Sequence, residues 1–185
     1  MNKVVGCFFY FANRFKDSKF FIAKAFGLGI LICFPAGYLN TYVLQTFTNN
    51  NPVNNALLVG FFAGGLVEEL LKFFALLFYL PTQKKLKKFD IVIFALFISL
   101  GFAVYENFGY VFNPLSASFE IAFVRAFTAV PMHIFNGIIM GYFFEFYSKT
   151  GDNKFLGYTV LLPIILHGSY NFFVSENLLI AKGII

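Results

Sequence analysis

The sequence predicts an all-α fold, a polytopic bundle of transmembrane helices that forms one integral membrane domain over residues 1–185. Hydrophobic residues make up 59% of the chain and charged residues only 12%, whereas a soluble domain carries about 25% charged residues. The charges also gather in short segments between long apolar runs. Because about 20 apolar residues are needed to cross a bilayer as a helix, we expect five full spans.

The expected spans are separated by turn residues and basic segments. They cover residues 20–47, 56–80, 89–112, 119–147 and 155–174. Asparagines and Pro52 form a polar loop after the first span, Pro81 ends the second, and Asn113 with Pro114 forms a turn after the third. In the fourth span Gly137 and Gly141 predict a close contact with a neighbouring helix. The apolar segment of residues 1–12 is about half as long as a span, and whether it forms a sixth crossing is left open.

The basic residues predict the orientation of the bundle. The segments 3–24, 84–88 and 149–154 hold 5, 4 and 2 Lys or Arg, whereas the loops 48–55 and 113–118 hold none. Under the positive-inside rule, the N-terminal basic segment is cytoplasmic and the C-terminus is extracytoplasmic. The basic residues therefore explain membrane orientation, and no motif predicts nucleic-acid binding.

Ionisable and amide side chains within the spans predict a common site. A charge at the centre of a bilayer costs about 3 kcal/mol on insertion scales, so such residues are rare without a function. Glu68, His133 and His167 each lie about halfway along a different span, which predicts that they share one layer. The full set of candidates comprises Glu68, Glu69, Lys72, Glu106, Asn107, Arg125, His133, His167 and Asn171.

Several of these residues also have a structural interpretation. Lys72 is expected to neutralise Glu68 or Glu69 as a buried ion pair. Arg125 is expected to pair with Glu120 or to reach the membrane interface. The agreement in depth among the carboxylate and the two histidines nevertheless favours one shared site.

Two kinds of hydrolytic chemistry suit such a site. A glutamate can act as general base while a histidine and an amide stabilise the oxyanion. Alternatively, Glu106, His133 and His167 form a zinc site with Glu68 as base. No His-Glu-x-x-His motif is present, so metal dependence stays open. The alternatives are a proton-coupled transporter, which uses the same side chains, and a non-catalytic membrane adaptor or immunity protein.

Four motifs, in order along nearly the whole chain, resemble the PrsW family of intramembrane proteases. They are Glu68-Glu69-Leu70-Leu71-Lys72, Gly101-Phe102-Ala103-Val104-Tyr105-Glu106-Asn107, Ala129-Val130-Pro131-Met132-His133, and His167-Gly168-Ser169-Tyr170-Asn171. This family is grouped with the CAAX prenyl endopeptidases, whose double-Glu and His-x-x-x-Asn motifs are matched here. Glu106 stands where the prenyl endopeptidases have a histidine.

The resemblance implies hydrolysis of a peptide bond in a single-pass membrane protein. By analogy with the family, the implied substrate is an anti-sigma factor cut at its extracytoplasmic side to start stress signalling, in the cytoplasmic membrane of a prokaryotic cell. We expect Glu68 to be the general base and Glu69 its partner, held by Lys72.

The other candidates take supporting or shared roles. His167 and Asn171 are expected to stabilise the oxyanion, and Glu106 and His133 to orient water or complete a metal site. Asn107 and Arg125 are expected to support the site. The sequence leaves the substrate and the oligomeric state open.

Overall fold

The computed structural model describes residues 3–82, 86–87, 89–112 and 118–181, and these residues form helices without any strand. The all-α prediction is therefore confirmed for the described part of the chain. The elements are α1 (Lys3–Phe47), α2 (Pro52–Leu57), the π-helix η1 (Leu58–Glu68), α3 (Glu69–Tyr79), the short 3₁₀-helix η2 (Leu80–Thr82), α4 (Asp90–Phe112), α5 (Phe119–Phe127), α6 (Ala129–Thr150) and α7 (Asn153–Ala181).

Three helical stretches among the described residues are long and apolar enough to cross a membrane: Lys19–Phe47, Asp90–Phe112 and Phe119–Thr150. They correspond to the first, third and fourth expected spans. The second expected span is helical in three consecutive pieces, α2, η1 and α3, and the fifth lies within α7. Residues 3–12 continue into α1 as one helix.

The fourth expected span is divided into two helices at Thr128. Its backbone angles, φ −121° and ψ −64°, separate α5 from α6. Pro131 lies three residues later, and a proline ring clashes with the carbonyl four residues before it, which here belongs to Phe127. The hydroxyl of Thr128 donates to the carbonyl of Val124 at 3.0 Å. This break sets the direction of α5 independently of α6.

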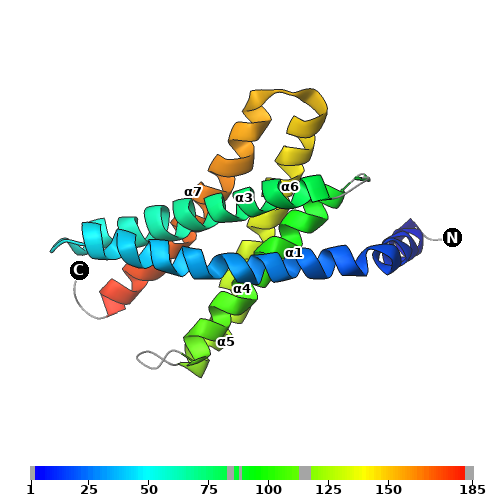
Figure 1. Cartoon of the computed structure of the whole chain (residues 1–185). Coiled ribbons are helices and arrows are strands. Elements are labelled where there is room, and N and C mark those ends of the chain that lie inside the picture. The colour runs from blue at the N-terminus through cyan, green and yellow to red at the C-terminus, as the bar shows by residue number, and fades with distance from the viewer. Residues whose placement is uncertain (1–2, 83–85, 88, 113–117, 182–185) are drawn as a thin grey trace.

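The helices cross one another around the middle of the bundle. α1 packs along α4 and η1, α4 packs along α6, and α7 packs against both η1 and α6. Figure 1 shows α3 running antiparallel to α1 while α4 and α6 cross them. The four helical segments η1, α4, α6 and α7 therefore meet in the interior, and each carries at least one of the predicted site residues.

Glycines allow α6 to approach α4 closely, as the sequence predicts. A β-carbon added to Gly137 would lie 2.6 Å from Oγ of Ser99, and one added to Gly141 would lie 2.6 Å from the Cα of Val92. Both distances are too short for any side chain. A buried apolar cluster that includes Leu76 and Met140 packs α1, α3, α4 and α6 together.

Candidate functional site

A group of buried charged and imidazole side chains lies where η1, α3, α4, α6 and α7 meet. Glu68, Glu69, Lys72, His133 and His167 are each 5% exposed or less. Hydrogen bonds connect four of them to one another and to Glu106, as described below. The structure therefore brings together the carboxylates and histidines that the sequence predicts at a common depth.

The π-helix η1 carries Glu68 to this junction. Its last residue is Glu68, and Glu69 begins α3. An added β-carbon at Gly64 would contact Nδ2 of Asn171 and lie 3.3 Å from Nε2 of His167. Long π-helices are rare, and π-bulges occur frequently at functional sites. The glycine thus lets η1 lie directly against the functional face of α7.

Glu69 fixes the orientation of His167. One oxygen, Oε1, lies 2.8 Å from Nδ1 of His167 and 2.8 Å from Nζ of Lys72. An ionised carboxylate only accepts hydrogen bonds, so Nδ1 carries the proton and Nε2 presents its lone pair. That nitrogen lies 3.9 Å from Oε2 of Glu68. The expected pairing of Lys72 with Glu69 is present.

His133 has the opposite arrangement of protons. Nζ of Lys72 lies 2.9 Å from its Nδ1, and Oε2 of Glu106 lies 3.0 Å from its Nε2. An ammonium group only donates, so Nδ1 accepts from Lys72 and Nε2 donates to Glu106. Lys72 also lies 4.3 Å above the ring of Phe102, within the range of a cation–π contact. The ammonium group of Lys72 therefore donates to both Glu69 and His133.

Arg125 closes the outer side of the cluster. Its Nη2 lies 2.8 Å from Oε1 of Glu106, and its guanidinium lies 4.0 Å above the ring of Tyr110. The sequence led us to expect Glu120 or the membrane interface as the partner of Arg125, and this expectation is corrected by the contact with Glu106. The break at Thr128 gives α5 its own direction, which brings Arg125 against α4.

Asn40 is a site residue that the sequence analysis did not identify. Its Nδ2 donates to Oε1 of Glu68 at 3.1 Å, while Oε2 of Glu68 is buried without a hydrogen-bond partner among the described residues. Asn40 is one of two amides in the last third of the first expected span, and its polarity was the available signal. No spacing connects it with Glu68, which lies in another helix.

The two remaining predicted amides occupy different places. Asn171 in α7 lies against Gly64 and lines a cavity beside the cluster. Asn107 instead donates from Nδ2 to the carbonyl of Ala122 at 3.0 Å, which ties α4 to α5. Asn107 therefore bonds to α5, the helix that carries Arg125, rather than to the buried cluster.

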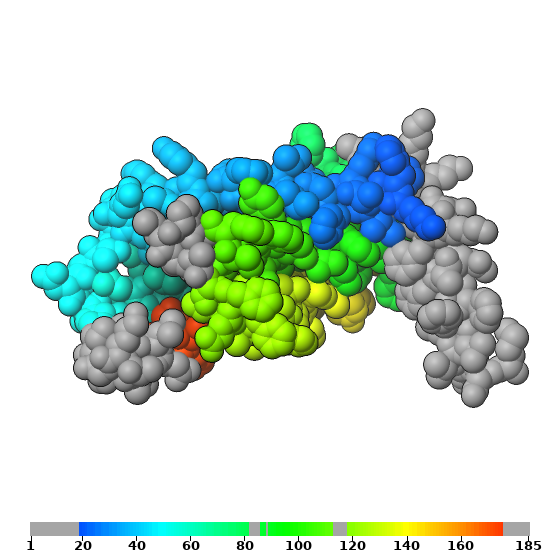
Figure 2. Space-filling view, turned by 90° about the horizontal axis from the view of Figure 1, so that it is seen from below, coloured from blue at the N-terminus to red at the C-terminus, as the bar shows by residue number. Residues whose placement is uncertain are grey.

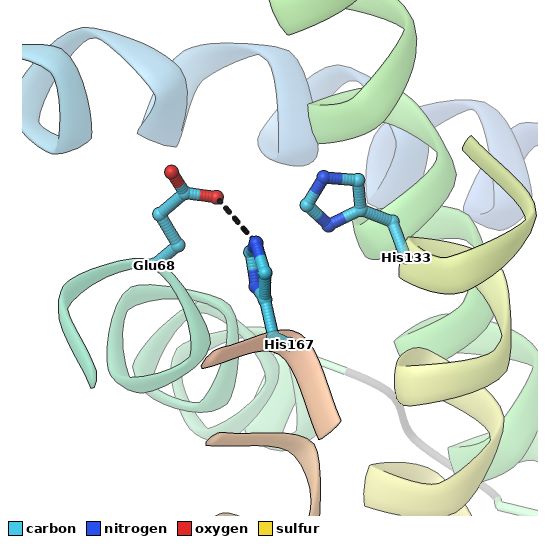
Figure 3. Close-up of side chains that lie close together, drawn as sticks. All are labelled: Glu68, His133 and His167. Atoms are coloured by element: carbon cyan, nitrogen blue, oxygen red, sulfur yellow. Dashed lines mark ion pairs between the residues drawn. The ribbon is translucent and has the colours of Figure 1, made fainter. Parts of the chain in front are cut away.

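Glu68, His133 and His167 form a candidate metal site. Each offers one ligand atom, and these atoms lie within 4.8 Å of one another. In Figure 3 the Glu68 carboxylate faces the ring of His167, with the ring of His133 beside them, and the three side chains come from η1, α7 and α6. The sequence places Glu106 in this trio, but the carboxylate that groups with both histidines is Glu68.

The chemistry of the donor set fits a zinc-type ion. Two histidines and one glutamate are a ligand set of hydrolytic zinc sites, and Oε2 of Glu68 is a buried acceptor without a hydrogen-bond partner among the residues that the structure describes. A metal-binding histidine typically donates its other ring N–H to a carboxylate, as His167 does to Glu69. His133 would have to release Lys72 or Glu106 to serve as the third ligand.

Comparison with known proteins gives a consistent result. The model of a family described as PrsW family intramembrane metalloprotease matches residues 18–184. The chain is 30% identical to Protease PrsW of Bacillus subtilis (strain 168) over 173 residues, which are 91% of this chain and 76% of that protein. It is 31% identical to Protease PrsW of Oceanobacillus iheyensis over 172 residues, with the same coverage of both chains.

A clostridial relative extends this similarity. Protease PrsW of Clostridioides difficile (strain 630) is 32% identical over 160 residues, which are 83% of this chain and 65% of that protein. No solved structure matches the chain.

Proposed function

Because the chain belongs to the PrsW family of intramembrane metalloproteases and is a membrane protease, we propose that it hydrolyses a peptide bond in a single-pass membrane protein. The observation that carries the mechanism is the buried Oε2 of Glu68, which has no hydrogen-bond partner among the described residues and lies 3.9 Å from Nε2 of His167. The names of the reported relatives support proteolysis rather than transport or adaptor function.

When no ion is bound at the site, Glu68 is the group that accepts a proton from the attacking water. Asn40 holds Oε1 at 3.1 Å and leaves Oε2 directed at the space beside His167. A general base has to lie within hydrogen-bond reach of the proton that it takes, and a water between Oε2 and Nε2 meets this condition. The proton moves to Oε2 as the water oxygen attacks the peptide carbonyl.

Asn171 is the better candidate for the donor that stabilises the oxyanion. His167 donates its Nδ1 proton to Glu69, so its Nε2 accepts from water or binds a cation. The side-chain amide of Asn171 lines the adjoining cavity and has no hydrogen bond to the described residues. A donor aimed at the developing negative charge supplies a large share of catalysis in acyl transfer.

With a zinc-type ion bound, Glu68, His133 and His167 would hold it as ligands, with Glu69 fixing the ring of His167 from outside, and Glu68 would then be a ligand instead of the general base. When bound, such an ion supplies a Lewis acid that polarises the carbonyl and activates water. Glu106 and Arg125 then act on the position of His133 through the contact of 3.0 Å between Glu106 and its Nε2.

The bundle crosses the cytoplasmic membrane five times in this proposal, with the N-terminal basic segment in the cytoplasm and the C-terminus outside. The alternation of basic and uncharged connecting segments supports it. In Figure 1 the beginning of α1 and the end of α7 lie at opposite ends of the view. A membrane-anchored regulator of the anti-sigma-factor kind, cut at its extracytoplasmic side, is the proposed substrate.

Co-expression with tagged single-pass membrane proteins tests this function. We expect a cleavage product with the wild-type chain and none with Glu68→Gln at equal accumulation. Glu145→Gln is the matched control, because Glu145 is also buried in the bundle but bonds to the backbone of Phe89 and to Lys149 instead. Equal products from the wild type and Glu68→Gln would remove Glu68 from the mechanism.

A further inference from the structure

A cavity of about 670 Å³ lies beside the cluster, between η1, α4, α5 and α7. Its volume is in the range of about 300–1,000 Å³ that ligand pockets occupy. In Figure 2 the yellow-green surface that includes α5 lies next to the red surface of α7, on the face seen from below. Three lining residues, Glu106, Arg125 and Asn171, belong to the site already described, so the cavity adjoins it.

The cavity has an apolar body and a polar end. Val59, Ile121, Val124 and Val174 form much of the wall. At the end near His167, the amide of Asn171 offers a donor and an acceptor that no other described residue uses. An occupant therefore needs an aliphatic or aromatic side chain and a backbone that can bond to an amide.

The charged residues that line the cavity leave a net negative charge. Glu106 and Arg125 neutralise each other at 2.8 Å. Glu120, in the first turn of α5, is exposed, lines the cavity, and makes no ion pair with any residue that the structure describes. One uncompensated negative charge thus remains on the α5 side, which favours a cationic group on the occupant.

We propose that this cavity binds an extended segment of the substrate polypeptide next to the bond that is cut, an inference that rests on the proposed protease function. One aliphatic or aromatic side chain packs against Val124 and Val174, and a basic side chain of the same segment lies against Glu120. An extended peptide leaves its own backbone groups unpaired, which is costly within a membrane. The Asn171 amide satisfies one of them where the segment reaches the site.

The specificity with which a reporter substrate is cleaved tests whether the cavity binds the substrate. The reporter is a single-pass membrane protein whose cut position has been mapped. It is made in versions that carry Ala or Phe beside the cut, and Lys or Glu at a nearby position. In Val124→Phe, the ratio of kcat/KM for Phe to that for Ala should fall about tenfold or more, because the cavity is filled. In Glu120→Lys, the preference for Lys over Glu should reverse. Phe123→Leu, on the same helix but outside the cavity lining, should leave both ratios as in the wild type.

Photo-crosslinking separates this inference from the proposed function. A benzophenone placed beside the cut position of the reporter is activated in the presence of the full-length Glu68→Gln variant. We expect attachment to α5 or α7 within the cavity, and its loss in Glu68→Gln combined with Val124→Trp. Attachment within the cavity together with cleavage that is equal in the wild type and Glu68→Gln would keep the cavity as the binding site and reject the proposed mechanism. Cleavage in which Val124→Phe and Glu120→Lys leave both kcat/KM ratios unchanged, with attachment outside the cavity, would reject the cavity as the binding site and keep the protease function.

Discussion

Nδ1 of His167 lies 2.8 Å from Oε1 of Glu69, and this contact directs the opposite ring nitrogen toward Glu68 at 3.9 Å. Two adjacent glutamates therefore have different tasks. Glu69, fully buried and paired with Lys72, orients the imidazole. Glu68 keeps one oxygen without a hydrogen-bond partner among the described residues, and this oxygen faces Nε2 of His167.

Replacing Glu69 with Gln tests the orienting role. The amide is nearly the same size as the carboxylate but cannot neutralise Lys72, and it accepts from His167 more weakly. Losing such an outer partner typically costs about 10- to 100-fold. We expect kcat for reporter cleavage in detergent to fall by about that factor with little change in KM. A kcat within twofold of the wild type would show that His167 is held by other contacts.

Asn40 provides a test that no sequence motif suggests. Its amide donates to Oε1 of Glu68, so Asn40→Ala should free the carboxylate and lower kcat about tenfold, in line with one lost hydrogen bond to a charged group. Asn40→Asp should lower kcat further, because a second carboxylate would face Glu68. Equal activity in both variants and the wild type would exclude a positioning role for Asn40.

Lys72 should be essential for stability as well as for the site. Its ammonium contacts Glu69 and His133 and is fully buried. Removing one partner of a buried ion pair costs about 3–5 kcal/mol, so Lys72→Met should strongly reduce thermal stability in detergent. Lys149→Met is the control, since the side chain of Lys149 is 57% exposed and such pairs contribute about 0–1 kcal/mol. Similar melting temperatures for the two variants would contradict a buried charge network.

A single methyl group at Gly64 should disturb the site directly. The new β-carbon of Gly64→Ala would contact Asn171 and lie 3.3 Å from Nε2 of His167, so cleavage should fall at least about tenfold while the protein still accumulates. Gly27→Ala is the matched control, because nothing lies within 4 Å of its added β-carbon. Equal activity of the two variants would show that η1 and α7 are not closely packed in the working enzyme.

The existence of the cluster is predictable from sequence, but its pairing is not. Membrane depth follows from counting residues along each span, which is why Glu68, Glu106, His133 and His167 are correctly expected near one another. The direction in which each side chain points depends on helix rotation. An α-helical period sets Glu68 and Lys72 on one face, whereas Glu68 ends a π-helical stretch and Lys72 contacts Glu69.

The departures have local causes as well. The partner of Arg125 depends on the break at Thr128, because the sequence alone predicts one continuous helix across residues 119–147. Asn40 escaped notice because it reaches Glu68, which lies on another helix, only through tertiary packing. The carboxylate that groups with the two histidines is likewise decided by how η1 lies against α7.

The most direct test of the site is the zinc content of the purified full-length protein, measured by elemental analysis together with reporter cleavage. We expect about one zinc per chain in the wild type and loss of both zinc and cleavage in Glu68→Gln, His133→Ala and His167→Ala. Glu106→Gln should retain zinc, because Glu106 contacts His133 and Arg125 from outside the trio. Zinc that persists in Glu68→Gln but is lost in Glu106→Gln would contradict the assignment of Glu68 to the centre.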